Sequence, residues 1–302
     1  MVLKTFINLC EDEINQLRDI TLQLLDVSIP IKNSSSCEFR IVGFPDYSWG
    51  DLTSEGNIIQ FKAIGVFDKS KERLDLLFDK KPMKIIEQYN KIIKFLQDYI
   101  YRDETVHRIH SIPPTKEEAI HRLQSQINEL LALITMLKKF GNEETIIIPD
   151  TNALIKNRNF EFYGNILKQN KIIRDTWTVY ITPTVITELD VLQHKKDRSP
   201  EFINKVKDAL KYLKGIHKQG DPIKGIYRNQ KQVKIQYLSD EPKSEKMSPW
   251  LNSNNYDDRI LATCLDIQIK NPGSEVILMT ADINFQTRAV SAFLSYIEPI
   301  IE

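Results

Sequence analysis

Several features that define other classes of protein are missing from this chain. Its three cysteines, Cys10, Cys37 and Cys264, are odd in number and far apart, which predicts a reducing cytoplasm without a disulfide framework. No two of them have the spacing of zinc ligands, so a zinc ribbon is excluded. No glycine-rich phosphate loop is present, so nucleotide-driven chemistry is not expected.

Long apolar runs and a net charge are missing as well. No apolar run approaches the length of a membrane-spanning helix. Glu11, Asp12 and Glu13 follow the first apolar residues so closely that a signal peptide is not expected. We therefore expect a cytoplasmic protein with no membrane partner. The 41 basic and 41 acidic residues cancel, so the whole chain has no charge that would steer it to nucleic acid.

What the chain does have is the composition of a globular protein. Apolar residues make up 41% and charged residues 27% of its 302 residues, enough for buried cores and for two domains. The charge is locally uneven, because twelve Lys or Arg residues between Lys195 and Lys234 stand against four Asp or Glu, an excess of eight. Such a tract is typical of a phosphate-binding surface, and equally typical of a helix with a lysine-rich solvated face.

Residues 1–141 predict a mainly helical α+β domain whose role the sequence does not reveal. The expected elements are helices before Leu25, over Met83–Tyr101 and over Thr115–Phe140, and strands over Cys37–Phe44 and Ile58–Phe67. Thr115-Lys-Glu-Glu118 has the form of a capping box at the start of the third helix. We expect its wide apolar face to pack within this domain, with dimerisation as the alternative.

Strands and helices alternate in the second domain, residues 146–302, after a hinge placed at Gly141–Glu144. The expected strands are Ile146–Ile148, Val179–Thr182, Val233–Tyr237 and Val276–Met279; the expected helices are Phe160–Gln169, a helix from Pro183, Phe202–His217 and Asp258–Ile269. This alternation is typical of a three-layer α/β fold with a mainly parallel central sheet.

Acidic residues follow the ends of these strands or begin the helices after them. Asp150 ends the first strand, Glu188 lies in the second turn of the helix from Pro183, and Asp282 follows the last strand. Asp257 and Asp258 stand at the head of another helix. In a parallel sheet these positions gather at one edge, where ligands usually bind.

Each of these acids also has an ordinary structural explanation. Asp257 or Asp258 could be an N-cap or first-turn acid. Asp150 and Asp282 could form turns, and Glu188 could be a surface residue. Taken singly, only Asp150 favours chemistry, but their order and spacing together favour a shared site. Clustered carboxylates repel one another unless a cation is bound, and oxygen ligands suit Mg²⁺ or Mn²⁺.

Four motifs in this order resemble the PIN-domain nucleases, over about half the chain from Ile146 to roughly Ile297. They are Ile-Ile-Ile-Pro-Asp150-Thr-Asn152-Ala-Leu, Thr184-Val-Ile-Thr-Glu188-Leu-Asp, Asn255-Tyr-Asp-Asp258-Arg-Ile-Leu-Ala-Thr-Cys and Leu278-Met-Thr280-Ala-Asp282-Ile-Asn284-Phe. The resemblance implies a PIN-like domain with an endonuclease activity. It would cleave single-stranded RNA with water activated by Mg²⁺ or Mn²⁺ and leave a 5′-phosphate.

The resemblance also assigns roles to residues. The implied catalytic metal ligands are Asp150, Glu188, Asp258 and Asp282, with Asp257 as a further ligand or a supporting acid. Residues implied to orient the carboxylates or water are Asn152, Thr280 and Asn284. The residues expected to contact RNA are Lys195, Lys196, Arg198, Lys205, Arg259 and Arg288.

The chain differs from small PIN toxins, because about 140 residues precede the nuclease-like half. In this architecture the chain resembles the larger stand-alone PIN proteins, while residues 1–141 resemble no known family. An inhibitory or recruiting protein that binds the N-terminal domain, and a homodimer, are possible partners beside RNA. Trp49, Trp177 and Trp250 could stack on bases, although packing in a core or interface is favoured. His107, His110 and His194 are interpreted as ordinary surface residues.

Three other functions stay open at this stage. A PIN-like domain could act on single-stranded or flap DNA instead of RNA. A strand-end aspartate could accept a phosphoryl group, although Asn152 and Ala281 stand where such folds generally have a second Asp or a Lys. A non-catalytic RNA-binding module could use its acids only to hold a structural metal.

Overall fold

The computed structural model describes residues 5–32, 47–79, 81–102, 112–138, 144–172, 174–247 and 250–300. The chain divides into two compact units, Ile7–Lys139 and Phe140–Glu302, the second of which includes Met1–Phe6. In the ranges described, none of the helices combines the length and apolar character that crossing a membrane requires.

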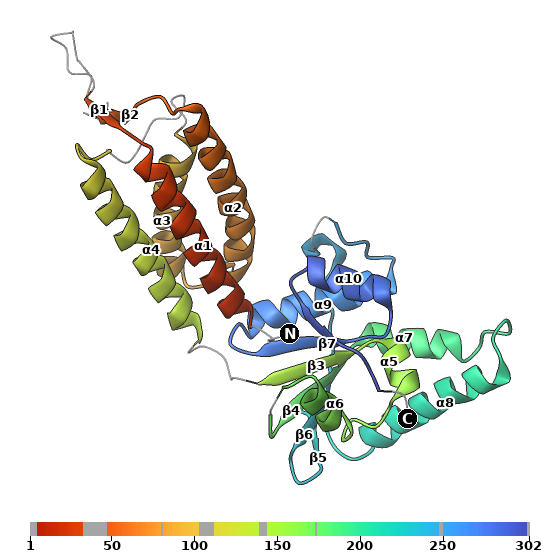
Figure 1. Cartoon of the computed structure of the whole chain (residues 1–302). Helices are drawn as coiled ribbons and strands as arrows, with labels where there is room; N and C mark the ends of the chain where they lie inside the picture. The colour runs from red at the N-terminus through yellow and green to blue at the C-terminus, as the bar shows by residue number, and fades with distance from the viewer. Residues whose placement is uncertain are drawn as a thin grey trace. The chain divides into compact units, whose positions relative to one another are not determined.

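Long helices make up most of the described part of the unit Ile7–Lys139 (Figure 1). They are α1 Phe6–Asp26, α2 Ser54–Phe78, α3 Met83–Tyr101 and α4 Lys116–Lys138, with a short antiparallel pair of strands, β1 Pro30–Lys32 and β2 Tyr47–Trp49. The hydroxyl of Thr115 accepts from the backbone N–H of Glu118 at 3.2 Å, as expected for a capping box. The apolar stripe of α4 is buried, including Leu123, Ile127 and Leu130.

The predicted strand Ile58–Phe67 is wrong, because this segment lies inside α2. Thr53 caps the helix by accepting from the N–H of Gly56 at 3.1 Å. The buried positions of α2 recur at helical spacing: Ala63, Phe67, Ser70, Leu74 and Leu77. Ile58, which suggested a strand, is 58% exposed. Packing against neighbouring helices thus overrides the local preference of a short apolar run.

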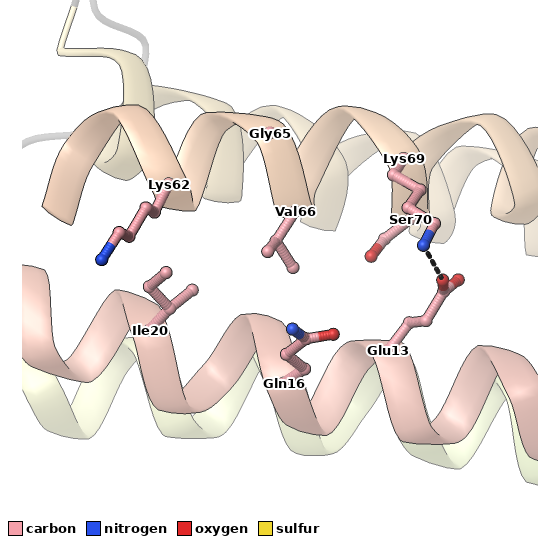
Figure 2. Close-up of a pocket in the computed structure, with 8 residues that line it drawn as sticks. All are labelled: Glu13, Gln16, Ile20, Lys62, Gly65, Val66, Lys69 and Ser70. Atoms are coloured by element: carbon pink, nitrogen blue, oxygen red, sulfur yellow. Dashed lines mark ion pairs between the residues drawn. The ribbon is translucent and has the colours of Figure 1, made fainter. Parts of the chain in front are cut away.

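A groove of about 320 Å³ runs between α1 and α2 (Figure 2). Figure 2 shows Glu13 of α1 and Lys69 of α2 pointing toward one another, with Oε1 and Nζ 4.0 Å apart. Glu13 also forms an ion pair with Arg73, which is buried. Burial raises the pKa of Glu13, and the positive charges of Arg73 and Lys69 oppose that rise. The negative charge of Glu13 in this groove is therefore compensated within the helical unit.

A six-stranded sheet forms the centre of the second unit, with the order β5-β6-β4-β3-β7-β8. The strands are β3 Thr145–Pro149, β4 Trp177–Ile181, β5 Ile226–Arg228, β6 Val233–Tyr237, β7 Glu275–Met279 and β8 Ser295–Ile297. All pairings are parallel except that of β5 with β6. Every residue of β3 is buried, as expected for a central parallel strand covered on both faces.

Helices cover both faces of this sheet. They are α5 Thr151–Lys156, α6 Tyr163–Gln169, α7 Pro183–Leu192, α8 Pro200–His217, α9 Tyr256–Lys270 and α10 Ile283–Ser291, and the 3₁₀ turn η1 Ser244–Lys246 precedes α9. In Figure 1, α9 and α10 lie on one side of the sheet while α6 and α8 lie on the other. Right-handed crossovers produce this arrangement when the strand order reverses beside β3. The predicted three-layer α/β fold is confirmed.

Two helices of this unit, α5 and α10, were not among the elements expected from the sequence. The chain enters α5 directly after β3, with Asp150 as its N-cap, whereas the sequence pattern suggested a loop. The predicted strand Cys37–Phe44, the hinge residue Gly141, and His107 and His110 lie outside the described residues.

Candidate active site

Asp150 lies where the strand order reverses, between the ends of β3 and β7. Its backbone N–H donates to the carbonyl of Met279 at 2.9 Å, which extends the pairing of the two strands by one residue. Its side chain is 3% exposed. Oδ1 accepts from the N–H of Ala153 and Oδ2 from the hydroxyl of Thr280, both at 2.5 Å. The carboxylate is thereby fixed at the sheet edge where open α/β folds bind ligands.

Glu188 enters the same neighbourhood from α7. Thr182 caps this helix by accepting from the N–H of Val185 at 3.2 Å, and Pro183 occupies the first turn. The hydroxyl of Thr151, the residue after Asp150, donates to Glu188 Oε2 at 2.5 Å. This bond joins the first and second motifs.

Asp257 and Asp258, the two neighbouring acids of the third motif, have different surroundings. Both lie in the first turn of α9, and Asn255 caps the helix by accepting from both of their N–H groups. Asp257 is half-buried and interacts electrostatically with Asp150, Glu188 and Asp282. The structure therefore groups Asp257 with the other acids.

Asp258 is directed elsewhere. It is 4% exposed and forms an ion pair with Arg288 of α10. Its Oδ2 also accepts from the N–H of Asn252 at 2.9 Å. The sequence pattern named Asp258 as a metal ligand and left Asp257 less certain, and the geometry favours the reverse order. Which of the two binds a cation stays a prediction.

The fourth motif supplies Asp282, the N-cap of α10. Its Oδ1 accepts from the N–H groups of Asn284 and Phe285, at 2.8 and 3.2 Å. Thr280 is fully buried and also accepts from the N–H of Asp282 at 3.1 Å, so one hydroxyl links Asp150 to Asp282. The side chains of Asn152 and Asn284 are exposed.

Electrostatics in this cluster disfavour ionised carboxylates. Burial raises the pKa of Asp150 to about 6; the hydrogen bonds from Thr280 and Ala153 oppose the rise, while Asp257 and Glu188 add to it. Burial also raises the pKa of Glu188, where Thr151 and Lys195 oppose the rise and Asp257 adds to it. Burial likewise raises the pKa of Asp257, where Asp282 adds to the rise and Arg288 opposes it. A nearby positive charge would relieve this repulsion.

The chemistry of these side chains fits a hard divalent cation. They supply only oxygen ligands, which Mg²⁺ and Mn²⁺ prefer. In the described residues, no three Asp, Glu, His or Cys side chains are arranged so that they could hold a metal ion as they stand. Mg²⁺ is commonly bound by one or two carboxylates, while water and substrate phosphates supply the remaining ligands. The donor set therefore fits such a cation without a preformed cage.

Two of the basic residues expected to contact RNA form ion pairs with acidic side chains of the same unit. Arg288 pairs with Asp258, and Arg259 donates to Glu241 Oε2 at 2.6 Å. The other predicted contacts, Lys195, Lys196, Arg198 and Lys205, are exposed. Lys195 lies close enough to Glu188 to lower its pKa. The solvent face of α8 adds four exposed lysines that sequence reasoning did not single out: Lys207, Lys211, Lys214 and Lys218.

Glu241 is a residue that the motifs did not identify. It follows β6, and its side chain is 8% exposed. Oε1 accepts from the N–H of Thr184 at 2.7 Å, and Oε2 accepts from the hydroxyl of Thr184 and from Arg259, both at 2.6 Å. Thr184 belongs to the helix that carries Glu188, and Arg259 to the helix that carries Asp257. Glu241 thus ties two helices that deliver acids to the site.

Comparison with known proteins gives one family. Residues 146–295 match a family described as PIN domain. Among solved structures, a domain of a functionally unknown protein from Methanocaldococcus jannaschii DSM 2661 is 19% identical. That match covers 50% of this chain and 89% of the other, with a TM-score of 0.31. No curated protein matches the chain.

PIN domains are generally nucleases, and those nucleases typically use divalent metals. The family predicted from the four motifs is confirmed by this match, which begins in β3 and ends at the first residue of β8. Through residues 146–295, the chain belongs to the PIN-domain family.

Proposed function

We propose that this protein is a divalent-metal-dependent endoribonuclease that hydrolyses phosphodiester bonds of single-stranded RNA and leaves a 5′-phosphate. The observation that carries the proposal is the group of mutually repelling acids around Asp150. A buried carboxylate with a raised pKa is costly for the fold. Its position at the reversal of strand order is where ligands bind in such sheets.

Asp150, Glu188, Asp257 and Asp282 would hold the cation, with Asp257 in the role that the sequence pattern gave to Asp258. When bound, Mg²⁺ or Mn²⁺ lowers the pKa of a water ligand and offsets charge on the phosphate. Hydrolysis adds that water's oxygen to phosphorus while the bond to the 3′ oxygen breaks, and the 3′ oxygen takes up a proton.

Other residues prepare these acids for the reaction. Thr280 and the N–H of Ala153 hold both oxygens of Asp150, and Thr151 holds Glu188. Hydrogen bonds of this kind fix the orientation of ligating carboxylates. Exposed lysines near the site, with Lys195 beside Glu188, would attract an RNA backbone that the acids alone repel.

The test is cleavage of an end-labelled single-stranded RNA by the purified full chain. We expect cutting with Mg²⁺ or Mn²⁺, none in excess chelator, and none with Asp150→Asn or Asp257→Asn. Asp175→Asn is a matched control, because Asp175 is an exposed acid that lies outside the four motifs and precedes β4, whereas the acids follow the far ends of the strands. Cleavage that persists in chelator would refute the proposal.

The same assay separates the competing functions. Single-stranded DNA and flap DNA of the same sequence are compared with RNA, and a strong preference for either would replace RNA as the substrate. Tight binding of RNA in Mn²⁺ without any product would instead favour a non-catalytic binding module. The expected products carry a 5′-phosphate, which a phosphate-dependent 5′ exonuclease can detect.

A further inference from the structure

Trp250 differs from the other two tryptophans of the chain. Trp49 and Trp177 are 5% and 6% exposed, which confirms that they pack in cores, whereas Trp250 is 53% exposed. The next residue, Leu251, packs against the hydrophobic core of the second unit. The backbone at Trp250 is therefore anchored while the indole ring lies in solvent. Of the two expectations for Trp250, packing in a core is wrong, and packing in an interface stays a prediction.

The anchored segment leads to the first turn of α9, the helix that brings Asp257 to the acidic cluster. The N–H of Asn252 donates to the carboxylate of Asp258 at 2.9 Å. Asp258 is the neighbour of Asp257, which interacts with Asp150 and Asp282. Two residues of chain span at most about 7 Å, so the backbone of Trp250 lies near the first turn of α9, which carries Asp257 and Asp258. A single strand that leaves the acids along the first turn of α9 reaches this exposed ring.

We propose that Trp250 stacks on an unpaired nucleobase of the RNA bound at the acidic centre. This inference rests on the proposed function and adds what recognises the substrate beyond its phosphates. An exposed aromatic ring binds any unpaired base, because every base has a π face. Bases in a duplex already stack on one another and leave no free face. Trp250 therefore selects single strands without selecting a sequence.

Binding is measured with the full chain carrying Asp150→Asn, so that the RNA stays intact. A single-stranded 12-nucleotide oligoadenylate quenches the tryptophan fluorescence, and Trp250→Phe removes most of that quenching because Trp49 and Trp177 are buried. Trp250→Ala weakens binding about 5- to 100-fold, the range for loss of one stacked base. Trp250→Phe, which keeps an aromatic ring, restores most of the affinity.

Two controls separate stacking from charge and from a loss of surface. An abasic oligonucleotide of the same length keeps the phosphates, and Trp250→Ala leaves its binding unchanged. Tyr227→Ala removes an aromatic residue of similar exposure, 58%, from the edge strand β5 and leaves oligoadenylate binding unchanged. Circular dichroism of each variant checks the fold.

The outcomes distinguish this inference from the proposed function. Equal affinity of the Trp250→Ala variant and its parent for oligoadenylate, or equal loss of affinity for the abasic strand, overturns the stacking role. The nuclease proposal survives either result if the wild-type chain cuts RNA with Mn²⁺. Absence of both cutting and binding overturns both.

Discussion

Replacing Asp150 by Asn should make the folded protein more stable while it abolishes cleavage. Asp150 is 3% exposed, and burial, with added repulsion from Asp257 and Glu188, raises its pKa from 3.8 to about 6. A carboxylate with a raised pKa is ionised at neutral pH at the expense of folding, because the unfolded chain ionises it more easily. Asn has the same shape and carries no charge.

The size of the effect follows from the shift. Roughly two pKa units at 1.36 kcal/mol each give about 3 kcal/mol of destabilisation at neutral pH. Against this, Asn loses a charged acceptor for the hydroxyl of Thr280, at a cost of about 1–2 kcal/mol. As an N-cap of α5 it is equivalent to Asp. The net expectation is a gain of about 1–2 kcal/mol, or several degrees in Tm.

The pH dependence has a definite sign. Below the unfolded-state pKa of 3.8, Asp150 is protonated in both the folded and the unfolded chain and does not lower the free energy of unfolding. Between pH 4 and about 6 the unfolded chain releases this proton and the folded chain keeps it, so stability falls as the pH rises. Above pH 6 the cost is constant. The advantage of Asp150→Asn should therefore be full at pH 7–8 and shrink toward pH 4.

The assay is urea unfolding in chelator at several pH values. A Trp49→Phe background removes the tryptophan of the helical unit, so that the fluorescence of buried Trp177 reports the unit that contains Asp150. Asp175→Asn is the matched control and should change little. The reasoning is refuted if Asp150→Asn is no more stable than its parent at pH 8. An advantage that does not decrease on acidification would refute it too.

Three further predictions concern the surroundings of the site. Asp258→Ala should lower the free energy of unfolding by about 2–3 kcal/mol in urea because it breaks a buried ion pair. Asp257→Asn should fold normally and be inactive. The opposite pattern would favour Asp258 as the metal ligand, as the sequence motif predicted. Glu241→Ala should lower kcat for RNA more than it changes KM. Glu241→Gln should restore part of kcat, because its amide keeps one of the two accepting oxygens; equal kinetics for all three proteins would exclude a positioning role. Removing Lys211 and Lys214 together should reduce the salt dependence of single-strand binding by about 1.4 in the log–log slope; an unchanged slope would show that α8 is only a solvated face.

Sequence patterns predicted most of the second unit because buried parallel strands are continuous apolar runs with distinct ends. The strand Val233–Tyr237 and the helix start at Pro183 agree with the structure. The acids were found for the same reason, since each follows a strand or opens a helix. Helix α5 was missed because Asp150 serves as both strand end and N-cap, and Asp-Thr-Asn is equally typical of a turn.

Side-chain direction is what the sequence could not supply. Consecutive residues of a helix differ by about 100° around its axis, so Asp257 and Asp258 face different neighbours although both belong to the motif. Asp258 is drawn to Arg288 by an ion pair, which leaves Asp257 to face the other acids. Glu241 was invisible for a similar reason: its partners Thr184 and Arg259 are far from it in sequence, and a lone glutamate in a loop carries no pattern.

The electrostatic repulsion among the acids of the site couples cation binding to the stability of the fold. A ligand that binds only the folded chain stabilises it by RT ln(1 + [L]/Kd), about 2.7 kcal/mol at 100 times Kd. This is close to the cost that the charge of Asp150 imposes on the unbound fold at neutral pH. Saturating Mn²⁺ should therefore stabilise the wild-type chain and have little effect on Asp150→Asn, so that the two exchange their order of stability. An equal response of both proteins to Mn²⁺ would mean that Asp150 does not hold the cation, and its burial would then need another explanation.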